Sequence, residues 1–348
     1  MAKFRLGIVG CGDIAGYMAW LARLHPKIQL TACCDSNSEK AKSFARKHRI
    51  PQVFTGYSDL LARGDLDAVY LAVPHHLHLP LADQAIQARI PVFLEKPLAC
   101  TVADGLSLVE TCLRHEVKVG VNYQYRYDSG CYALRRAVQS GALGAVFSVR
   151  INVPWRRERS YFQQSGWHTS LAQSGGGTLI TQGSHFLDIA LWALDEQPLS
   201  CVGYTQRSEL PDVEVEDLAM GIVQMKSGAL IQISSTMAAA REQAVTIEVY
   251  GEAGTARYTN QPVPRISFRG IRVKKEKPPV RGLHALQRSL EGFRRWVVSD
   301  EDYLTPAEAA LPALSVVESI YRSAESGRRE NIAIPSVPGK GVPNENSR

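Results

Sequence analysis

The sequence has few features that would require an oxidising compartment or a membrane. It contains seven cysteines, an odd number, and no spaced CxxC pair. In a chain of this size, such cysteine usage indicates reduced and mostly buried thiols. No positively charged segment followed by a short apolar run begins the chain, and no uncharged apolar run approaches the ~18 residues of a membrane span. We therefore expect an unexported, cytoplasmic protein with no membrane partner.

The sequence also lacks a long basic stripe. Its 40 lysines and arginines stand against 34 aspartates and glutamates, and they are scattered apart from short clusters such as WRRER at 155–159. A nucleic-acid-binding face normally shows a longer basic run with interleaved aromatic residues. We therefore expect no nucleic-acid partner and favour small anionic molecules as ligands.

The first third of the chain alternates short apolar runs with helical patterns. The chain has 348 residues, of which 45% are hydrophobic, and this length exceeds what one hydrophobic core usually organises. The patterns predict strands at 4–10, 30–35, 66–73, 91–95 and 118–123, and helices at 37–49 and 101–116 with Ser36 and Thr101 as N-caps. Apolar strands that alternate with helices predict an α/β domain, a doubly wound parallel sheet covered on both faces.

The pattern changes after residue 125. We expect helices at 128–140 and 178–194, strands at 144–153, 201–206, 217–225, 229–236 and 244–251, and closing helices at 283–298 and 306–326, the last capped by Thr305. Strands that follow one another without helices predict an open, mostly antiparallel sheet, hence a second domain of α+β type. The predicted boundaries are 1–125 for the first domain, 126–335 for the second and 336–348 for a flexible tail.

A glycine-rich turn stands between the first strand and the first helix, in GIVGCGDIAGYM (7–18). Gly10 permits the turn, Gly12 lets backbone N–H groups approach a pyrophosphate, and Ala15 allows close packing of helix and strand. Asp13 and Ile14 complete this turn. The pattern predicts a Rossmann-like, dinucleotide-binding domain.

An acidic residue ends the second strand, twenty positions after Ala15. There the carboxylate of Asp35, with Ser36 beside it, can accept the ribose hydroxyls of an adenosine; the alternative is that Asp35 only caps the next helix. A carboxylate repels a 2′-phosphate, and Ser36 and Asn37 offer no cation to bind one. We therefore predict NAD rather than NADP as the cofactor, unless Arg5 or Arg46 folds inward.

The segment FLEKPLA (93–99) places Glu95 and Lys96 at the carboxyl end of a parallel strand, where open α/β sheets bind ligands, so we expect both to contact the cofactor. A lysine there can hydrogen-bond a substrate oxygen, and its pKa falls as it loses water. The alternative is a surface ion pair between Glu95 and Lys96.

A histidine stands in the segment GGGTLITQGSHFLDIALWAL (175–194). The three glycines indicate a hinge-like entry to a helix on which His185 and Asp188 share one face. An imidazole with a pKa near neutrality can exchange the proton of a hydroxyl, and Asp188 can orient it. A histidine satisfied inside a core is the alternative.

These motifs together resemble the glucose–fructose oxidoreductase and inositol dehydrogenase (Gfo/Idh/MocA) family. The resemblance covers residues 4 to about 335 and includes VPHHLHLPLADQAI (73–86), EKP and GALGAV (141–146). It implies a Rossmann-like domain, and a second domain whose sheet makes homodimer or homotetramer contacts. It also implies hydride transfer between a nicotinamide and a hydroxyl carbon of a sugar, cyclitol or similar polyol. By resemblance Lys96 and His185 are catalytic, and the turn with Pro74, His75 and His78 lies beside the nicotinamide ribose.

One position departs from the family pattern. Many members carry aspartate four residues before the histidine, where this chain has Thr181. Without that carboxylate we expect a lower pKa for His185 and a larger share of the proton transfer for Lys96, while Thr181 can hydrogen-bond the substrate. The departure leaves an alternative function open, a catalytically weak or inactive sensor of dinucleotide or sugar.

Aromatic and charged residues near these motifs suit a polyol. Aromatic faces stack on sugar C–H surfaces, and arginines bind hydroxyls or carboxylates; packing within a subunit interface is the alternative. The candidate substrate-binding residues are Tyr123, Arg126, Trp155, Trp167, His168 and Asp188. The cluster His75, His76 and His78 lacks acidic or cysteine partners at ligand spacing, so we expect no metal.

Overall fold

The computed structural model describes residues 2–164, 166–208 and 213–337, so residues 338–348 of the predicted tail lie outside the described residues. The first part of the chain forms a six-stranded sheet, with strands β1 (Phe4–Val9), β2 (Ile28–Cys34), β3 (Gln52–Phe54), β4 (Ala68–Leu71), β5 (Val92–Leu94) and β6 (Val119–Val121). The helices between them are α1 (Asp13–Arg23), α2 (Ser38–His48), α3 (Tyr57–Leu61), α4 (His78–Gln87) and α5 (Val102–Arg114), with short 3₁₀ turns at His75–Leu77 and Gln124–Tyr127.

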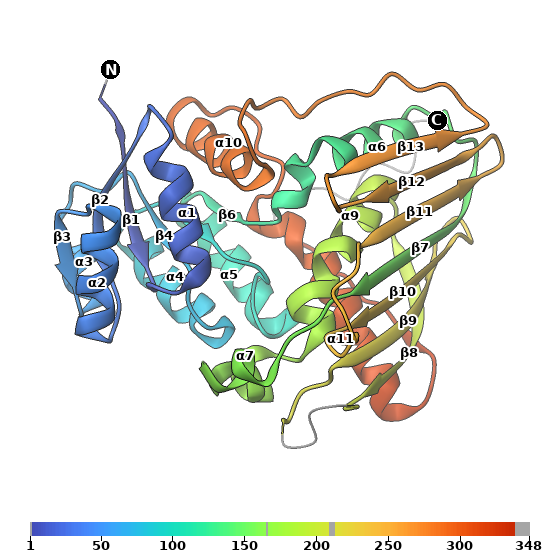
Figure 1. Cartoon of the computed structure of the whole chain (residues 1–348), viewed down its shortest axis with the longest axis horizontal. Coiled ribbons are helices and arrows are strands. Elements are labelled where there is room, and N and C mark those ends of the chain that lie inside the picture. Colours follow the sequence, from blue (N-terminus) through green and yellow to red (C-terminus); the bar gives the residue numbers. More distant parts are fainter. Residues whose placement is uncertain (1, 165, 209–212, 338–348) are drawn as a thin grey trace.

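The six strands are all parallel, in the order β3-β2-β1-β4-β5-β6 (Figure 1). This is the order of a Rossmann fold, in which ligands bind where the strand order reverses, between β1 and β4. The prediction of a doubly wound parallel sheet is confirmed. The short strand β3 was not predicted, because its three residues carry no apolar run.

The second part of the chain forms an eight-stranded sheet in the order β13-β12-β11-β7-β10-β9-β8-β14. Its strands are β7 (Val146–Pro154), β8 (Pro198–Gln206), β9 (Leu218–Met225), β10 (Leu230–Thr236), β11 (Thr246–Gly251), β12 (Thr255–Thr259), β13 (Arg265–Arg269) and β14 (Glu330–Asn331). Only β7 and β10 pair in parallel, so the sheet is mostly antiparallel, as predicted.

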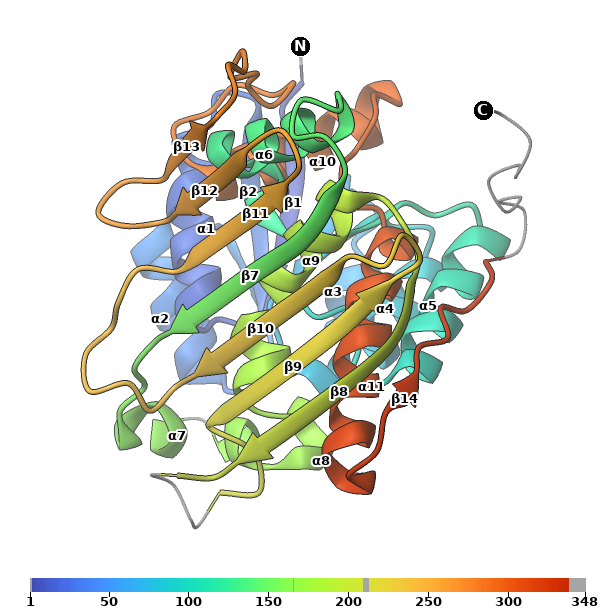
Figure 2. The ribbon, with the colours of Figure 1, turned by 90° about the vertical axis from the view of Figure 1, so that its right-hand side faces the viewer.

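Helices lie on one face of the second sheet, and in Figure 2 the other face is free of helices from the described residues. The helices of this part are α6 (Ser129–Gln139), α7 (Arg159–Gln164), α8 (Leu171–Ser174), α9 (Ser184–Leu194), α10 (Ala285–Ser299) and α11 (Leu311–Ser326). A π-helical turn (Leu179–Gly183) leads directly into α9, and 3₁₀ turns cover Gly166–Thr169 and Ala307–Ala310. Within the described residues, no helix is long and apolar enough to cross a bilayer.

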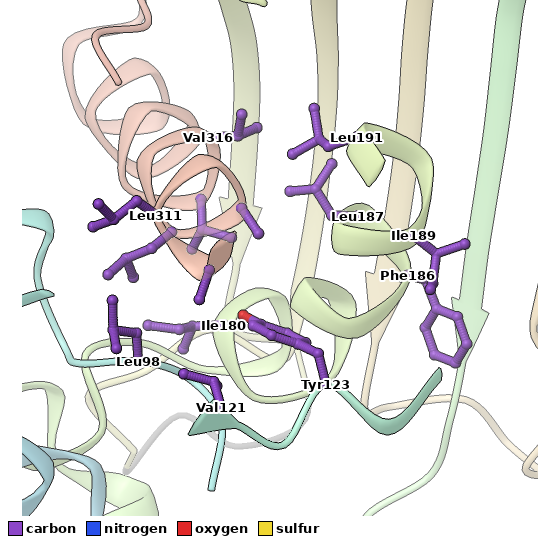
Figure 3. Packing of buried hydrophobic residues seen from close by; sticks show 14 of the residues in the cluster. Leu98, Val121, Tyr123, Ile180, Phe186, Leu187, Ile189, Leu191, Leu311 and Val316 are labelled. Atoms are coloured by element: carbon purple, nitrogen blue, oxygen red, sulfur yellow. The ribbon is translucent and has the colours of Figure 1, made fainter. Parts of the chain in front are cut away.

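The buried side chains form a core that crosses the predicted boundary at residues 125 and 126. One cluster runs from α4 and α5 through α9 and α11 to the second sheet. In Figure 3, Ile180 of the π-helical turn lies among Leu98, Val121 and Tyr123 of the first part. A separate cluster joins α1 and α2 to α10, which packs on the first sheet although it follows the second in the chain.

Two of the predicted helix caps are wrong. Thr101 does cap α5, since its side chain accepts from the Asp104 N–H. At α2, however, Asn37 is the cap instead of Ser36. The last helix does not start after Thr305: a 3₁₀ turn without any side-chain cap precedes α11.

Candidate active site

The glycine turn connects β1 to α1 at the reversal point of the first sheet. Gly10 has a φ of +84°, and a Cβ built there would lie 2.2 Å from the Ala72 oxygen, so only glycine lets the chain turn this close to β4. A Cβ at Gly12 would meet nothing within 4 Å, and no side chain caps α1. Asp13 and Ile14 are exposed. The N-terminus of α1 is therefore open, and it fits a pyrophosphate.

Asp35 follows β2 and lies against this turn. Its carboxylate accepts from the Cys11 N–H at 2.9 Å and from the Asn37 N–H at 3.0 Å, beside the exposed Ser36. The ammonium of Lys40, in the first turn of α2, lies 3.7 Å from the same carboxylate. Sequence reasoning considered Arg5 and Arg46 besides the two residues after Asp35, but it missed Lys40, which the turn of the helix brings back. Arg5 pairs with Asp67 at 3.0 Å instead.

Lys96 follows β5 at the carboxyl edge of the first sheet. Its Nζ donates to the main-chain oxygen of Thr181, in the π-helical turn before α9. Burial lowers the pKa of Lys96 to about 8; the charge of Glu95 opposes this shift and the charge of Arg157 adds to it. Part of the lysine population is therefore a neutral amine near physiological pH, and such an amine can accept a proton.

Two of the predicted cofactor contacts hold the chain around Lys96 instead. Glu95 is buried and accepts from the hydroxyl of Tyr70 and, at 2.8 Å, from the amide of Asn122. His78 is fully buried, and both its ring nitrogens lie against main-chain oxygens, one of them 2.8 Å from that of Pro97. Because protein groups occupy both ring nitrogens of His78 and the carboxylate of Glu95, we remove these two residues from the candidate cofactor set.

The turn after β4 meets the segment 166–175 of the second part, which contains a 3₁₀ turn and α8. Pro74 is partly exposed, and His75 lies 2.6 Å from a main-chain oxygen at the end of α8. The His75 ring packs against Trp167 with centroids 4.7 Å apart, and Trp167 packs against His168 at 3.7 Å. His168 in turn lies 3.2 Å from the hydroxyl of Tyr161. The candidates His75, Trp167 and His168 form one aromatic cluster, in which the Nδ1 atoms of both histidines lie against protein atoms.

His185 lies in the first turn of α9 and is 6% exposed. Its ring makes edge-on contacts with Tyr125 at 5.2 Å and with the buried Tyr123 at 5.9 Å, while its Nδ1 has no hydrogen-bond partner among the described residues. Burial, and to a lesser degree the charge of Lys96, lower the pKa of His185 well below its usual value. The imidazole is therefore neutral at pH 7, and its pKa is lowered in the direction expected from Thr181 in place of an acid, with burial as the main cause.

Asp188 does not orient His185. Both of its carboxylate oxygens accept from Arg126, at 2.9 and 2.6 Å, and this ion pair is buried. Arg126 also donates to the main-chain oxygens of Leu304 and Ala309. The pair therefore connects α9 to the 3₁₀ turn that carries Arg126 and, through Arg126, to the chain at Leu304 and Ala309. Because these bonds occupy both side chains, we remove Arg126 and Asp188 from the candidate substrate set.

The three glycines at 175–177 are not a hinge. A Cβ at Gly177 would lie 1.8 Å from the main-chain oxygen of Glu216, and the Gly177 N–H donates to the Glu216 carboxylate at 2.6 Å. Sequence reasoning missed Glu216, because no pattern in the adjacent residues indicates a contact with Leu179, 37 residues earlier. It also missed Gln182, whose buried Nε2 lacks a hydrogen-bond partner among the described residues. The buried Nε1 of the predicted candidate Trp155 lacks one there as well. Such orphaned donors suit substrate hydroxyls.

The structure thus gathers the candidates into two neighbouring sites. Gly10, Gly12 and Asp35 lie together as a candidate dinucleotide cradle, and Lys96 contacts Thr181 and acts electrostatically on His185. The neutral fraction of the Lys96 amine and the neutral His185 imidazole can each donate or accept a hydrogen bond with a small polar molecule.

Known proteins resemble the chain along its length. Residues 4–123 match the model of an oxidoreductase family with an NAD-binding Rossmann fold, and residues 132–257 match the GFO/IDH/MocA C-terminal domain. An inositol 2-dehydrogenase of Burkholderia multivorans is 27% identical and aligns over 96% of this chain and 98% of its own length. A D-apiose dehydrogenase of Paraburkholderia graminis is 26% identical, over 94% and 89% respectively.

A solved structure extends the likeness to three dimensions. The WlbA dehydrogenase of Bordetella pertussis, determined in complex with NADH and UDP-GlcNAcA, is 28% identical. It superposes with a TM-score of 0.85 over 96% of this chain and 100% of that chain.

Proposed function

The chain belongs to the Gfo/Idh/MocA family of NAD-binding oxidoreductases, and from this premise we propose that it moves a hydride between NAD and a secondary alcohol or ketone of a sugar, cyclitol or sugar derivative. The observation that carries the proposal is the contact of Lys96 with Thr181, four residues before His185. It joins the sheet that carries the cofactor cradle to the helix that carries the histidine. The relatives are named as dehydrogenases and reductases, which favours an enzyme over a sensor.

The cofactor is held by the first domain. The open N-terminus of α1, from Gly12 to Ala15, takes the pyrophosphate, and Asp35 accepts the hydroxyls of the adenosine ribose. Pro74 and His75 border the nicotinamide end of the site. When bound, the nicotinamide supplies or accepts the hydride.

The proton that accompanies the hydride goes to Lys96. A secondary hydroxyl must lose its proton as its carbon loses hydride, and an amine with a pKa of about 8 accepts it near neutral pH. His185 is neutral and holds the reacting oxygen by a hydrogen bond, since its low pKa makes it the weaker base. Thr181 supplies the main-chain acceptor that keeps Lys96 in place.

The substrate lies against aromatic side chains of the second domain. Trp155 and Trp167 offer flat faces for sugar C–H groups. His168 lies next to Trp167, and the ring of Tyr123 contacts the ring of His185 edge-on. Arg157 stacks on Trp155 and Tyr161, with ring centroids 5.2 and 5.6 Å from its guanidinium carbon. Its guanidinium also pairs with the Glu242 carboxylate at 3.3 Å, so the substrate screen should cover neutral and acidic sugars alike.

The first test is cofactor titration followed by a polyol screen. Calorimetry should show tight NADH binding, and turnover should then appear on one class of sugar or cyclitol. Lys96→Ala should reduce kcat by about a thousandfold, because it removes the proton acceptor and an oxygen contact, with the Kd for NADH within about twofold. Full turnover in Lys96→Ala would overturn the assignment, and NADH binding without turnover on any polyol would return the sensor as the better function.

We further propose a cytoplasmic homodimer or homotetramer. None of the seven cysteines, all of which lie in the described residues, is in a disulfide, which suits a reducing compartment. The face of the second sheet opposite its helices carries exposed apolar side chains, and it offers the surface for subunit contacts.

A further inference from the structure

The N-terminus of the π-helical turn that leads into α9 is capped by a residue from a distant part of the chain. The first N–H groups of a helix have no partner within it, and Thr178, which precedes the π-helical turn, makes no side-chain cap. Glu216, just before β9, fills this role. Its carboxylate accepts from Gly177 at 2.6 Å and from Leu179 at 2.9 Å, and its main-chain oxygen accepts from Thr178 at 3.0 Å.

Tyr321 of α11 completes the cap. Its hydroxyl donates to the Glu216 carboxylate at 2.9 Å and accepts from the Ile180 N–H at 3.2 Å. Glu216 is 8% exposed, and burial raises its pKa while these donors oppose the shift. A carboxylate at a helix N-terminus is stabilised by the helix dipole. Every amide from Gly177 to Ile180 thus finds an acceptor on Glu216 or Tyr321.

The capped segment carries the acceptor of the catalytic lysine. Thr181 follows Ile180 directly, its hydroxyl donates to the Gly177 oxygen at 2.6 Å, and its main-chain oxygen accepts from Lys96. The turn is π-helical from Leu179 to Gly183, a conformation that costs energy unless its surroundings hold it and that is frequent at functional sites. The location of the Lys96 acceptor therefore depends on what fixes Gly177 and Leu179.

We propose that Glu216 is a positioning residue for hydride transfer, fixing the π-helical turn so that the Thr181 oxygen holds Lys96 in place for the substrate. The inference rests on the proposed function of Lys96. Glu216 itself touches none of the reacting groups: it acts through Gly177, Leu179 and Thr181. An error of about 1 Å in the placement of a catalytic group can cost roughly a hundredfold in rate.

The test is a double-mutant cycle between Glu216 and Lys96. Glu216→Ala should lower kcat by about a hundredfold, with the Kd for NADH unchanged, since the cofactor cradle lies on other elements. Glu216→Gln keeps the shape and one acceptor and should recover part of that loss. In a Lys96→Ala background the Glu216 substitutions should cost almost nothing further, because two residues that act through one group are not additive. Additive losses, or full turnover in Glu216→Ala, would overturn the proposal.

A matched control is available two residues away. The carboxylate of Glu214 also accepts a main-chain N–H at the start of a helix, that of Leu171 at 2.7 Å, but it does not touch the π-helical turn. Glu214→Gln should leave kcat within about twofold, whereas a loss equal to that of Glu216→Gln would assign the effect to general loosening.

A second readout does not need turnover. The lysines can be ¹³C-methylated reductively, and the resonance of Lys96 identified by its disappearance in Lys96→Arg. The chemical shift of this resonance should change in Glu216→Gln and should stay unchanged in Glu214→Gln. Glu216→Gln is also the variant to use if Glu216→Ala does not fold. An unmoved Lys96 resonance contradicts the positioning role, whereas absent turnover with a moved resonance contradicts only the proposed function.

Discussion

At the scale of single residues, Lys96 sets the pH dependence of the reaction. Its pKa is lowered to about 8, so the fraction of Lys96 that is a neutral amine increases as pH rises through that value. The oxidation rate should therefore rise between about pH 7 and 9, and the reduction rate should fall over the same range. Measurement of kcat/KM against pH in both directions checks this. Lys96→Arg, which stays charged, should abolish the limb near pH 8, and a limb near the ordinary lysine pKa would contradict the assignment.

Lys40 should tune the choice between the two nicotinamide cofactors. Its ammonium lies 3.7 Å from the Asp35 carboxylate and partly neutralises the charge that repels a 2′-phosphate. Lys40→Met should widen the preference for NADH over NADPH by roughly fivefold, the equivalent of about 1 kcal/mol for charges ~4 Å apart in water. Calorimetric Kd values for both cofactors check this. Lys42→Met is the control, because Lys42 pairs with Glu39; an equal effect there would show that only net charge matters.

Part of the site was predictable from sequence because local signals mark it. The residues adjacent to a glycine at a strand end, or to a lysine after a parallel strand, indicate its role. Gly10 and Lys96 could therefore be identified as candidate site residues. The partner of Asp188 was not predictable in this way. Helical spacing correctly puts Asp188 on the face of His185, but Arg126, 62 residues earlier, takes both its oxygens. Glu216 was missed for the same reason, since its partners are distant in sequence.

At the scale of elements, the ion pair between Arg126 and Asp188 holds α9 to the turn after β6. Removing one partner leaves the other charge buried, which typically costs ~3–5 kcal/mol. Asp188→Ala should therefore lower the free energy of unfolding by about that amount in urea titrations. Arg126→Met combined with Asp188→Leu should recover much of the loss, because the pair is then replaced by apolar groups.

The exposed pair of Lys42 and Glu39 provides the comparison for this prediction. Its partners lie 2.9 Å apart on the surface of α2, and surface pairs contribute ~0–1 kcal/mol. Glu39→Ala should therefore change the free energy of unfolding by less than about 1 kcal/mol. A double variant of Arg126 and Asp188 that is less stable than Asp188→Ala would mean that the pair supplies more than charge balance.

At the scale of the whole molecule, sequence periodicity predicted both sheets but not how the chain shares helices between them. The two strand patterns differ in what separates the strands, and this was enough to distinguish a parallel from an antiparallel sheet. Helix α10 carries an apolar face, as expected, yet its Leu290 and Phe293 pack in the cluster of α1 and α2. Amphipathicity shows that a helix face is buried, but it does not identify the partner.

The exposed face of the second sheet should join subunits. Along β8, β9 and β10 the side chains alternate: Cys201, Val223 and Ile231 are buried toward the helices. The opposite face also carries exposed polar side chains such as Gln206 and Gln232. Its exposed apolar side chains are Val202, Tyr204, Met220, Ile222 and Leu230. In register, Tyr204 lies beside Met220, and Val202 beside Ile222. Side chains of this kind, gathered on one flat face, are typical of an interface.

Charges placed on that face should separate the subunits without unfolding them. Tyr204 is 75% exposed and Met220 50%, so Tyr204→Asp with Met220→Asp removes little buried surface within the subunit but places two carboxylates where a partner would pack. Light scattering after gel filtration should show a dimer or tetramer for the unaltered protein and a monomer for the double variant, with the same circular dichroism. Leu283→Asp, at an 85% exposed position before α10, should keep the oligomer. An unaltered mass in the double variant would place the subunit contact elsewhere, whereas a monomer that retains turnover would show that each subunit carries a complete site.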